Sequence, residues 1–272
     1  MLIDTHSHLN FNAYRDDADE VIRRSLNNNI WMINVGSQYK TSERAVEIAE
    51  RYQEGIYASV GLHPIHLAEG IFKTKLDKEE IAFQTRNENF DYDSYKNLAQ
   101  SKKVVAIGEI GLDYYYRPKT KIKLEEFKNR QKEVFLEQFR LAKELNLPII
   151  FHCRMAHQEL IGMLGNNAGG KGVVHCFTGD WRQAQEYLDM GFYIGFNGII
   201  FKMDLNEVIE KVPLDKALIE TDCPYLTPPP MEGRNEPAYV KYVVEKIAKI
   251  RGLDCEKLEE ITSKNARELF KI

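Results

Sequence analysis

The chain has 272 residues, 43% of them hydrophobic and 29% charged, with 17 Gly and 9 Pro, and this composition excludes collagen-like and disordered proteins. Its length exceeds the ~100–200 residues of an ordinary domain, but a single α/β barrel routinely reaches ~250 residues. The net charge of −4 argues against a long basic track for duplex DNA, so a nucleic acid would be held locally at a strand end, with metal ions supplying positive charge.

Hydropathy and cysteine usage predict the compartment. The mean hydropathy is −0.44. The longest apolar runs are about six or seven residues, whereas a membrane span needs ~20. The first ten residues, MLIDTHSHLN, have no basic segment ahead of an apolar stretch and so do not resemble a signal peptide. The four Cys residues are scattered, without CxxC pairs. We therefore predict a soluble, cytoplasmic protein with no membrane contact and no obligate protein partner.

Eight short apolar, β-branched runs are predicted to be strands: Leu2–Leu9, Ile30–Val35, Ile56–Leu62, Val104–Leu112, Pro148–His152, Gly172–Phe177, Phe192–Phe196 and Ala217–Asp222. Amphipathic stretches are predicted to be helices: Asp17–Asn28, Ser42–Gln53, Ile122–Leu145, Ala156–Leu164, Trp181–Met190, Asn206–Lys211, Pro237–Ile250 and Cys255–Phe270. This alternation predicts parallel βαβ units. At this length, eight units predict one (β/α)8 TIM barrel domain over residues 1–272. An open doubly wound sheet is less favoured, because it would normally carry a Gly-rich turn after its first strand.

The connection between the third and fourth predicted strands, residues 65–103, is longer than a single helix requires. Within it, Thr85–Lys96 is polar with interleaved aromatic residues. We interpret this segment as an outer decoration of the barrel or, alternatively, as a lid.

Six residues at predicted C-terminal strand ends have side chains that bind metal ions: His6, His8, Glu109, His152, His175 and Asp222. The C-terminal ends of parallel barrel strands open on one face, where barrel enzymes place their active sites. A single His there is usually structural. Four of the chain's seven His residues lie at these predicted strand ends, however, and this clustering favours a metal site. Imidazoles and carboxylates together suit Zn, Mn or Mg.

The same six residues are too many for one four-coordinate ion with an open position. We therefore predict two divalent metal ions that share the carboxylate of Glu109. The first and eighth strands are adjacent in a closed barrel, so His6, His8 and Asp222 would hold one ion. His152 and His175, on the neighbouring fifth and sixth strands, would hold the other.

Residues next to these ligands are also interpreted by strand alternation. Cys153, Cys176 and Cys223 each follow a predicted ligand directly, so they should point outward toward the helices. Asp4 and Glu220 should point inward below the site, where a carboxylate can accept the second N–H of a metal-bound imidazole. An unrelated salt bridge is the alternative for both.

Several motifs along the chain together resemble one known family: DTHSHLN, VGLHP, GEIGLDYY, LPIIFHCR, VHCF, ETDCPYLTPPP and GRNEP. They are similar to those of the TatD family of metal-dependent deoxyribonucleases, within the barrel amidohydrolase superfamily. The resemblance runs from Leu2 to the tail at 265–270, although residues 65–103 form a longer connection than family members generally have. It implies that the six residues above are metal ligands and that Glu109 is the shared one. Arg154, and Arg234 with Asn235, match motif positions near the site.

The resemblance and the ligand pattern predict hydrolysis of a phosphodiester, most directly at single-stranded 3′ ends of DNA. Two ions roughly 3.5–4 Å apart would activate a water molecule. Glu109 and Asp222 are the predicted catalytic residues, and Asp222 would take the proton from this water. The predicted substrate-binding residues are Arg154, Arg234 and His63, with a structural role as the alternative for His63.

Three alternatives stay open at this stage. The Tyr114–Tyr116 run can stack on an unpaired base or simply pack its loop. A metal-dependent ester or amide hydrolase, such as a D-aminoacyl-tRNA deacylase or a small-ester hydrolase, would use the same site. A nucleic-acid-binding protein with a structural metal is disfavoured, because structural zinc sites are closed and have four ligands.

Overall fold

The computed structural model describes residues 1–67, 73–74, 83–84, 88–115, 120–167 and 169–272. Its main sheet has the strand order β1-β2-β3-β6-β7-β8-β9-β10, and every paired neighbour in it is parallel. These strands are β1 (Leu2–Ser7), β2 (Ile30–Val35), β3 (Ile56–Val60), β6 (Val104–Asp113), β7 (Ile149–Arg154), β8 (Gly172–Val174), β9 (Tyr193–Phe196) and β10 (Ala217–Ile219). A separate antiparallel pair is formed by β4 (Lys73–Thr74) and β5 (Phe83–Gln84).

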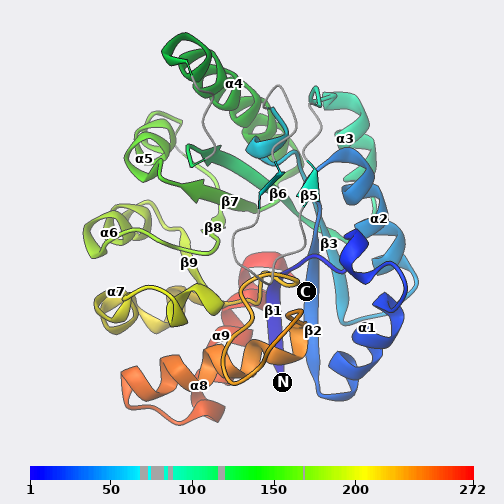
Figure 1. Ribbon diagram of the computed structural model, residues 1–272, viewed down its shortest axis with the longest axis vertical. Helices are drawn as coiled ribbons and strands as arrows, with labels where there is room; N and C mark the ends of the chain where they lie inside the picture. The colour runs from blue at the N-terminus through cyan, green and yellow to red at the C-terminus, as the bar shows by residue number, and fades with distance from the viewer. Residues whose placement is uncertain (68–72, 75–82, 85–87, 116–119, 168) are drawn as a thin grey trace.

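The helices lie around the outside of this sheet, from α1 through α4 to α9 (Figure 1). They are α1 (Ala18–Asn27), α2 (Tyr39–Glu50), α3 (Tyr92–Leu98), α4 (Lys121–Leu145), α5 (His157–Asn166), α6 (Trp181–Asp189), α7 (Asn206–Lys211), α8 (Val240–Arg251) and α9 (Cys255–Phe270). Short 3-10 turns join them: η1 (Asn12–Tyr14), η2 (Pro64–Leu67), η3 (Gly198–Phe201), η4 (Leu214–Lys216) and η5 (Pro237–Tyr239).

The predicted (β/α)8 barrel is confirmed. β1 meets the segment that follows β10 through a parallel bridge between Ser7 and Cys223, and the Thr5 hydroxyl donates to the carbonyl of Ile219 in β10 at 3.1 Å. Closure is therefore made by a few contacts rather than by a long ladder. These contacts lie beside the strand ends that carry His6 and Asp222, so closure and site geometry depend on each other.

The interior of the barrel changes from apolar to polar along its axis. Ile150, Val173 and Leu218 form a buried cluster with Leu269 and Phe270 from the end of α9. His152 lies two residues after Ile150 in β7, on the same face of that strand. His175 and Glu220 lie just past the ends of β8 and β10, with the Nδ1 atom of His175 3.0 Å from the Oε1 atom of Glu220. The apolar cluster thus fills the lower part of the barrel and leaves the polar side chains at its mouth.

Local sequence explains where several helices begin and end. The Asp180 carboxylate accepts a hydrogen bond from the Gln183 N–H at 2.9 Å, which caps the start of α6. α8 ends at Arg251 and is followed by Gly252, whose φ of 63° is a left-handed conformation that glycine adopts without strain. The helix predicted from Pro237 starts later, because Pro237–Tyr239 forms the 3-10 turn η5 and α8 begins at Val240.

Four strands end earlier than predicted: β3 ends at Val60 rather than Leu62, and three others end before a residue of the site. β1 ends at Ser7, β8 at Val174 and β10 at Ile219, so His8, His175 and Asp222 lie on the loops that follow. Asp222 has a φ of 58°, which no regular strand adopts. Alternation along a strand therefore cannot fix how the side chains past these ends point.

The helix α3 was not predicted and occupies the long connection. Buried Tyr95 donates its hydroxyl to Glu88 at 3.0 Å, while the ammonium of Lys96 lies 2.5 Å from Glu144 of α4. The described part of the predicted Thr85–Lys96 segment thus packs on the outer helices. Residues 85–87 lie outside the described residues.

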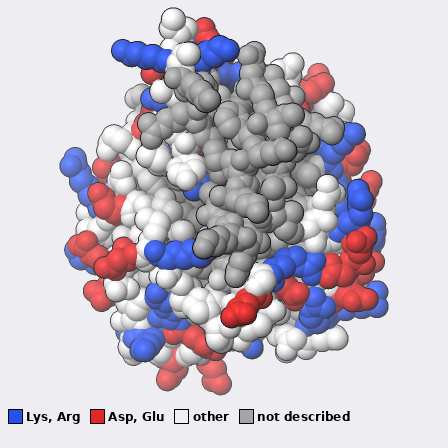
Figure 2. Space-filling view, in the orientation of Figure 1, with Lys and Arg blue, Asp and Glu red and all other residues white. Residues whose placement is uncertain are grey.

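Charged side chains of both signs are mixed around the face shown in Figure 2, as the near-balanced composition of the chain leads one to expect. Within the described residues, no helix combines the length and the apolar character required to cross a bilayer.

Candidate metal centre

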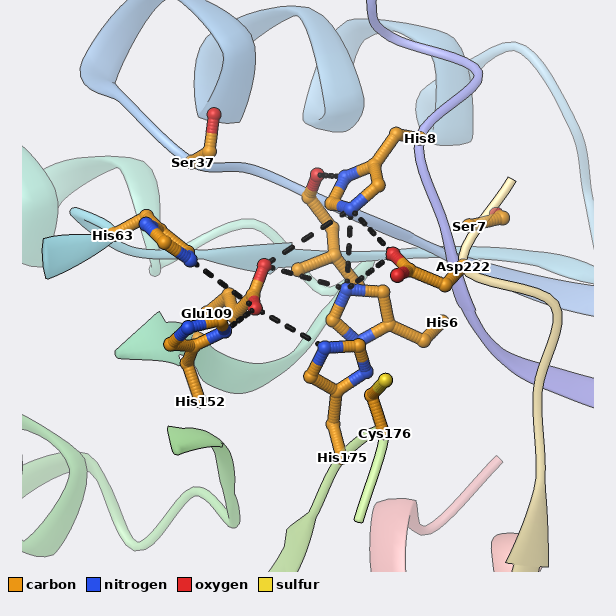
Figure 3. A network of polar contacts seen from close by, with 12 residues as sticks. His6, Ser7, His8, Ser37, His63, Glu109, His152, His175, Cys176 and Asp222 are labelled. Carbon is orange, nitrogen blue, oxygen red and sulfur yellow. Dashed lines mark hydrogen bonds and ion pairs between the residues drawn. The ribbon is translucent and has the colours of Figure 1, made fainter. Parts of the chain in front are cut away.

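The six predicted ligands converge at the mouth of the barrel, with Glu109 from β6 at the centre of the group (Figure 3). Glu109 is 4% exposed and lies among imidazoles from four segments of the chain. We call His6, His8 and Asp222 the first ligand group, and His152 and His175 the second. The ligand atoms of the first group lie close enough together to hold one ion. Those of the second group do so together with Glu109.

The first ligand group faces one oxygen of Glu109. The Nε2 atoms of His6 and His8 lie 3.2 Å apart, and the Nε2 atom of His8 lies 3.3 Å from the Oδ1 atom of Asp222. The Oε2 atom of Glu109 lies 3.5 Å from the Nε2 atom of His6. Three side chains from opposite ends of the sequence therefore meet across the β1–β10 closure.

The second ligand group faces the other oxygen of Glu109. Its Oε1 atom lies 2.6 Å from the Nδ1 atom of His152 and 3.2 Å from the Nε2 atom of His175. One carboxylate thus presents a separate oxygen to each group, which is the arrangement that a bridging ligand requires.

The second nitrogen of three rings is held by an oxygen, which orients the ring toward Glu109. His8 donates Nδ1–H to the carbonyl of Val35 at 2.8 Å. The other rings meet carboxylates: His175 Nδ1 lies 3.0 Å from Glu220, and His152 Nε2 lies 3.2 Å from Asp113. Burial alone would lower the pKa of both rings, but the neighbouring carboxylates outweigh it and raise the pKa of His152 to about 9 and that of His175 well above its usual value. A metal ion must therefore displace a proton from each ring, and the nitrogen facing the centre then offers its lone pair. The donor set and its supporting oxygens fit a divalent metal site.

The charges at the centre favour cations. Burial alone would raise the pKa of Glu109, but the imidazoles gathered around it outweigh burial and hold this pKa well below its usual range. Burial likewise opposes the ionised form of Asp222, yet its hydrogen bond to His8 holds the pKa low. Both carboxylates are therefore negative at neutral pH, as metal ligands must be.

Glu220 supports the second ligand group from below, as predicted. It is fully buried, and its Oε1 atom also accepts the backbone N–H of Cys176 at 2.6 Å. Asp4 behaves differently from the prediction that it would hold an imidazole. Its carboxylate accepts from the backbone N–H of His6 at 3.2 Å and from the N–H and hydroxyl of Thr221, and burial raises its pKa to about 8.

Gly195 of β9 leaves the space that Glu220 occupies, and this gives a testable prediction. A Cβ atom at residue 195 would lie 2.8 Å from the Oε2 atom of Glu220. Gly195→Ala should displace Glu220, leave His175 without its partner and weaken metal binding by about 10–100-fold, the usual cost of losing such support. Titration of the metal-free protein against a chromophoric chelator measures this affinity. Gly162→Ala is the matched control, because nothing lies within 4 Å of its Cβ position; equal affinity in both variants would refute the prediction.

Two residues at the site were missed or misplaced by sequence reasoning. Asp113 was not singled out, although it lies four residues after Glu109 on the same strand and so shares its face; β6 runs on to Asp113, one residue past the predicted end. Cys176 was predicted to point outward, and this is wrong. Its Sγ atom lies within 4.8 Å of ligand atoms of His175 and Asp222, because the strand has ended and the φ of Cys176 is 44°. Cys153 and Cys223 are buried, as expected for small apolar side chains.

His63 follows β3 and lies on the Oε1 side of Glu109, with its Nε2 atom 3.5 Å from that oxygen. Its Nδ1 atom accepts the backbone N–H of Ile65 at 3.0 Å. Burial, and then the charge of His152, lower the pKa of His63, so the ring is neutral and carries its proton on Nε2. His63 therefore presents an N–H donor to the centre rather than a lone pair for a metal.

The two predicted phosphate-binding arginines lie in different surroundings. Arg154 ends β7 two residues after His152, and its guanidinium lies 3.8 Å from the centroid of the Tyr115 ring. Arg234 donates to the carbonyl of Ala13 at 2.6 Å and to both oxygens of Asp17. Tyr116, the last residue of the predicted base-stacking run, lies outside the described residues.

The protein is thus a (β/α)8 barrel with a candidate metal centre at its mouth, where imidazoles and carboxylates surround the buried carboxylate of Glu109. A family model described as TatD related DNase matches residues 3–271. The chain therefore belongs to the TatD related DNase family, and the resemblance found in its motifs is confirmed.

Relatives of known name agree with this assignment. The uncharacterized metal-dependent hydrolase YabD of Bacillus subtilis is 42% identical, with 100% of both chains covered. The 3′-5′ ssDNA/RNA exonuclease TatD of Salmonella typhimurium is 32% identical over 100% of this chain and 99% of its own. A crystal structure of YjjV, a TatD homologue from Escherichia coli K12, superposes with a TM-score of 0.80 at 28% identity, covering 100% of this chain and 98% of that one.

Proposed function

We propose that this protein is a divalent-metal-dependent hydrolase of phosphodiester bonds that removes nucleotides from the 3′ end of single-stranded DNA. The observation that carries the proposal is the position of Glu109, with one carboxylate oxygen toward each ligand group. The exonuclease name of the Salmonella relative supports the choice of substrate.

In this proposal the first ligand group and Glu109 would hold one ion, and the second group with Glu109 would hold another. The ions would be Mg, Mn or Zn, in keeping with the imidazole and carboxylate donors. When bound, they supply Lewis-acid polarisation of the phosphoryl oxygen and activation of water.

The chain's own groups supply the proton transfers and the orientation of the substrate. Asp222 is ionised and its Oδ1 atom faces the centre, so it is the group that accepts the proton of the attacking water. The Nε2–H group of His63 lies near the Oε1 atom of Glu109, the oxygen that faces the second ligand group. From this position it can donate a hydrogen bond to an oxygen of the departing nucleotide. Arg154, at the rim two residues beyond His152, is the proposed contact for the neighbouring phosphate.

A single-stranded oligonucleotide labelled at its 5′ end tests the proposed activity. With Mg, Mn or Zn added, the purified protein should produce a ladder that shortens from the 3′ end. An oligonucleotide that stays intact with every ion would contradict the nuclease proposal. Hydrolysis of nitrophenyl acetate but not of bis-nitrophenyl phosphate would then assign the site to the ester or amide hydrolase alternative.

Chelation separates a catalytic metal from a structural one. The ligands sit on a barrel whose core is built from apolar side chains, unlike a zinc finger, which folds around its ion. EDTA should therefore abolish hydrolysis and leave the far-UV circular dichroism spectrum nearly unchanged. Loss of the helical signal on chelation would mean that the metal is structural.

A further inference from the structure

Asp222 needs support from outside its own strand. It lies three residues past the end of β10, on a turn with a left-handed φ of 58°. On one side the turn is held by β1, because the N–H of Asp222 donates to the carbonyl of His6 at 2.8 Å. The contacts on the other side of this turn therefore determine how rigidly the Asp222 carboxylate is held against His8.

A single side chain, Asn235, spans that other side. Its amide nitrogen donates to the carbonyls of Thr221 at 3.0 Å and Tyr225 at 2.6 Å, which lie one residue before and three residues after Asp222. Its amide oxygen accepts the N–H of Glu236 at 2.9 Å, which fixes the direction of the amide. Asn235 is fully buried, so no water competes for these bonds.

Asn235 is itself held between two forked ion pairs. Arg234, which precedes it, binds both oxygens of Asp17 at 2.9 and 2.5 Å. Glu236, which follows it, binds the guanidinium of Arg24 at 2.7 Å through both oxygens. Asp17 directly precedes α1 and Arg24 lies within it, so three consecutive residues fasten the Asp222 turn to the start of α1.

Tyr14 completes this attachment between the two pairs. It is fully buried and donates its hydroxyl to the carbonyl of Asn235. The guanidinium of Arg234 lies 4.2 Å from the centroid of its ring. The guanidinium of Arg234 is thus occupied by Asp17, Ala13 and Tyr14.

From these contacts we propose that Arg234, Asn235 and Glu236 form a latch that positions Asp222 for metal binding and catalysis. Asn235 acts through the backbone of the turn, and Arg234 acts by holding Asn235 in place. This assigns Arg234 a positioning role rather than the phosphate contact predicted from its motif. The inference rests on the proposed metal centre but not on the identity of the substrate.

Calorimetric titration of the metal-free protein with Mn²⁺ tests the latch directly. The wild type should bind two ions, and Asn235→Ala should weaken one binding event by about 10–100-fold while leaving the other unchanged. Fewer than two events in the wild type would contradict the metal centre itself. Two unchanged events in a folded Asn235→Ala variant would overturn the latch alone.

If Asn235→Ala does not fold, a double-mutant cycle on the partly exposed ion pair between Arg234 and Asp17 provides the test instead. Arg234→Ala and Asp17→Ala should weaken the same Mn²⁺ event, and the double variant should be no weaker than Arg234→Ala alone, because that substitution already removes the ion pair with Asp17. At saturating Mn²⁺, kcat should fall and KM should stay constant. A KM raised by Arg234→Ala but not by Asp17→Ala would show a direct phosphate contact and overturn the proposal. Arg182→Ala, which removes an exposed arginine from the pair with Glu186, is the control.

Discussion

Glu109→Ala should empty both metal positions and reduce hydrolysis by more than about 100-fold. Loss of a residue that only supports a metal ligand typically costs ~10–100-fold, and loss of a ligand shared by both ions should cost more. The reason is geometric: each oxygen of this carboxylate faces a different ligand group. His175→Ala should mainly empty one position, because the other position keeps the whole first ligand group together with Glu109. Metal content per chain after dialysis, measured for both variants, makes the comparison.

The Glu109 variants also need a check on folding. Removing this carboxylate leaves several buried imidazoles without their shared partner, which is destabilising. Glu109→Gln keeps the size of the side chain and one oxygen donor, so thermal melts of both variants separate misfolding from metal loss. A folded Glu109→Ala protein that retained two ions per chain would rule out the bridging assignment.

Asp222→Asn should lower turnover more than it lowers metal occupancy. The substitution keeps the size of the side chain and one oxygen ligand but removes the negative charge and the ability to accept a proton. General-base catalysis typically contributes ~10²–10⁴-fold, so a loss of this order should persist at saturating Mn or Mg. The 5′-labelled oligonucleotide assay, run at increasing metal concentration, measures the residual rate.

The outcome of that metal titration separates the two roles of Asp222. A deficit that remains when both positions are filled supports proton transfer by this carboxylate. Full rescue by metal would mean that Asp222 is a ligand alone and that another group takes the proton.

Where the sequence was regular, the fold could be predicted closely. The run Ile30–Val35 is the strand β2 with the predicted ends, and Cys255–Phe270 is the helix α9. Glu220 was predicted to lie below the site, and its Oε1 atom is 3.0 Å from the Nδ1 atom of His175. These successes depend on periodic burial, which is a property of the local sequence.

Prediction failed where the chain leaves its strands. Cys176 faces the site because its φ is 44°, and no pattern in the neighbouring residues signals that turn. The surroundings of Arg234 depend on Asp17, more than 200 residues away, which composition and spacing cannot reveal. α3 escaped prediction because its polar, aromatic sequence is stabilised by packing against α2 and α4 rather than by a clear apolar stripe.

A crystal structure with Mn²⁺ and a short, non-hydrolysable phosphorothioate oligonucleotide tests the central claim most directly. The account predicts two anomalous scattering peaks, one beside His6, His8 and Asp222 and one beside His152 and His175, with Glu109 between them. The phosphate nearest the 3′ end should lie against both peaks. A single peak, peaks away from Glu109, or an oligonucleotide bound outside the barrel mouth would contradict it.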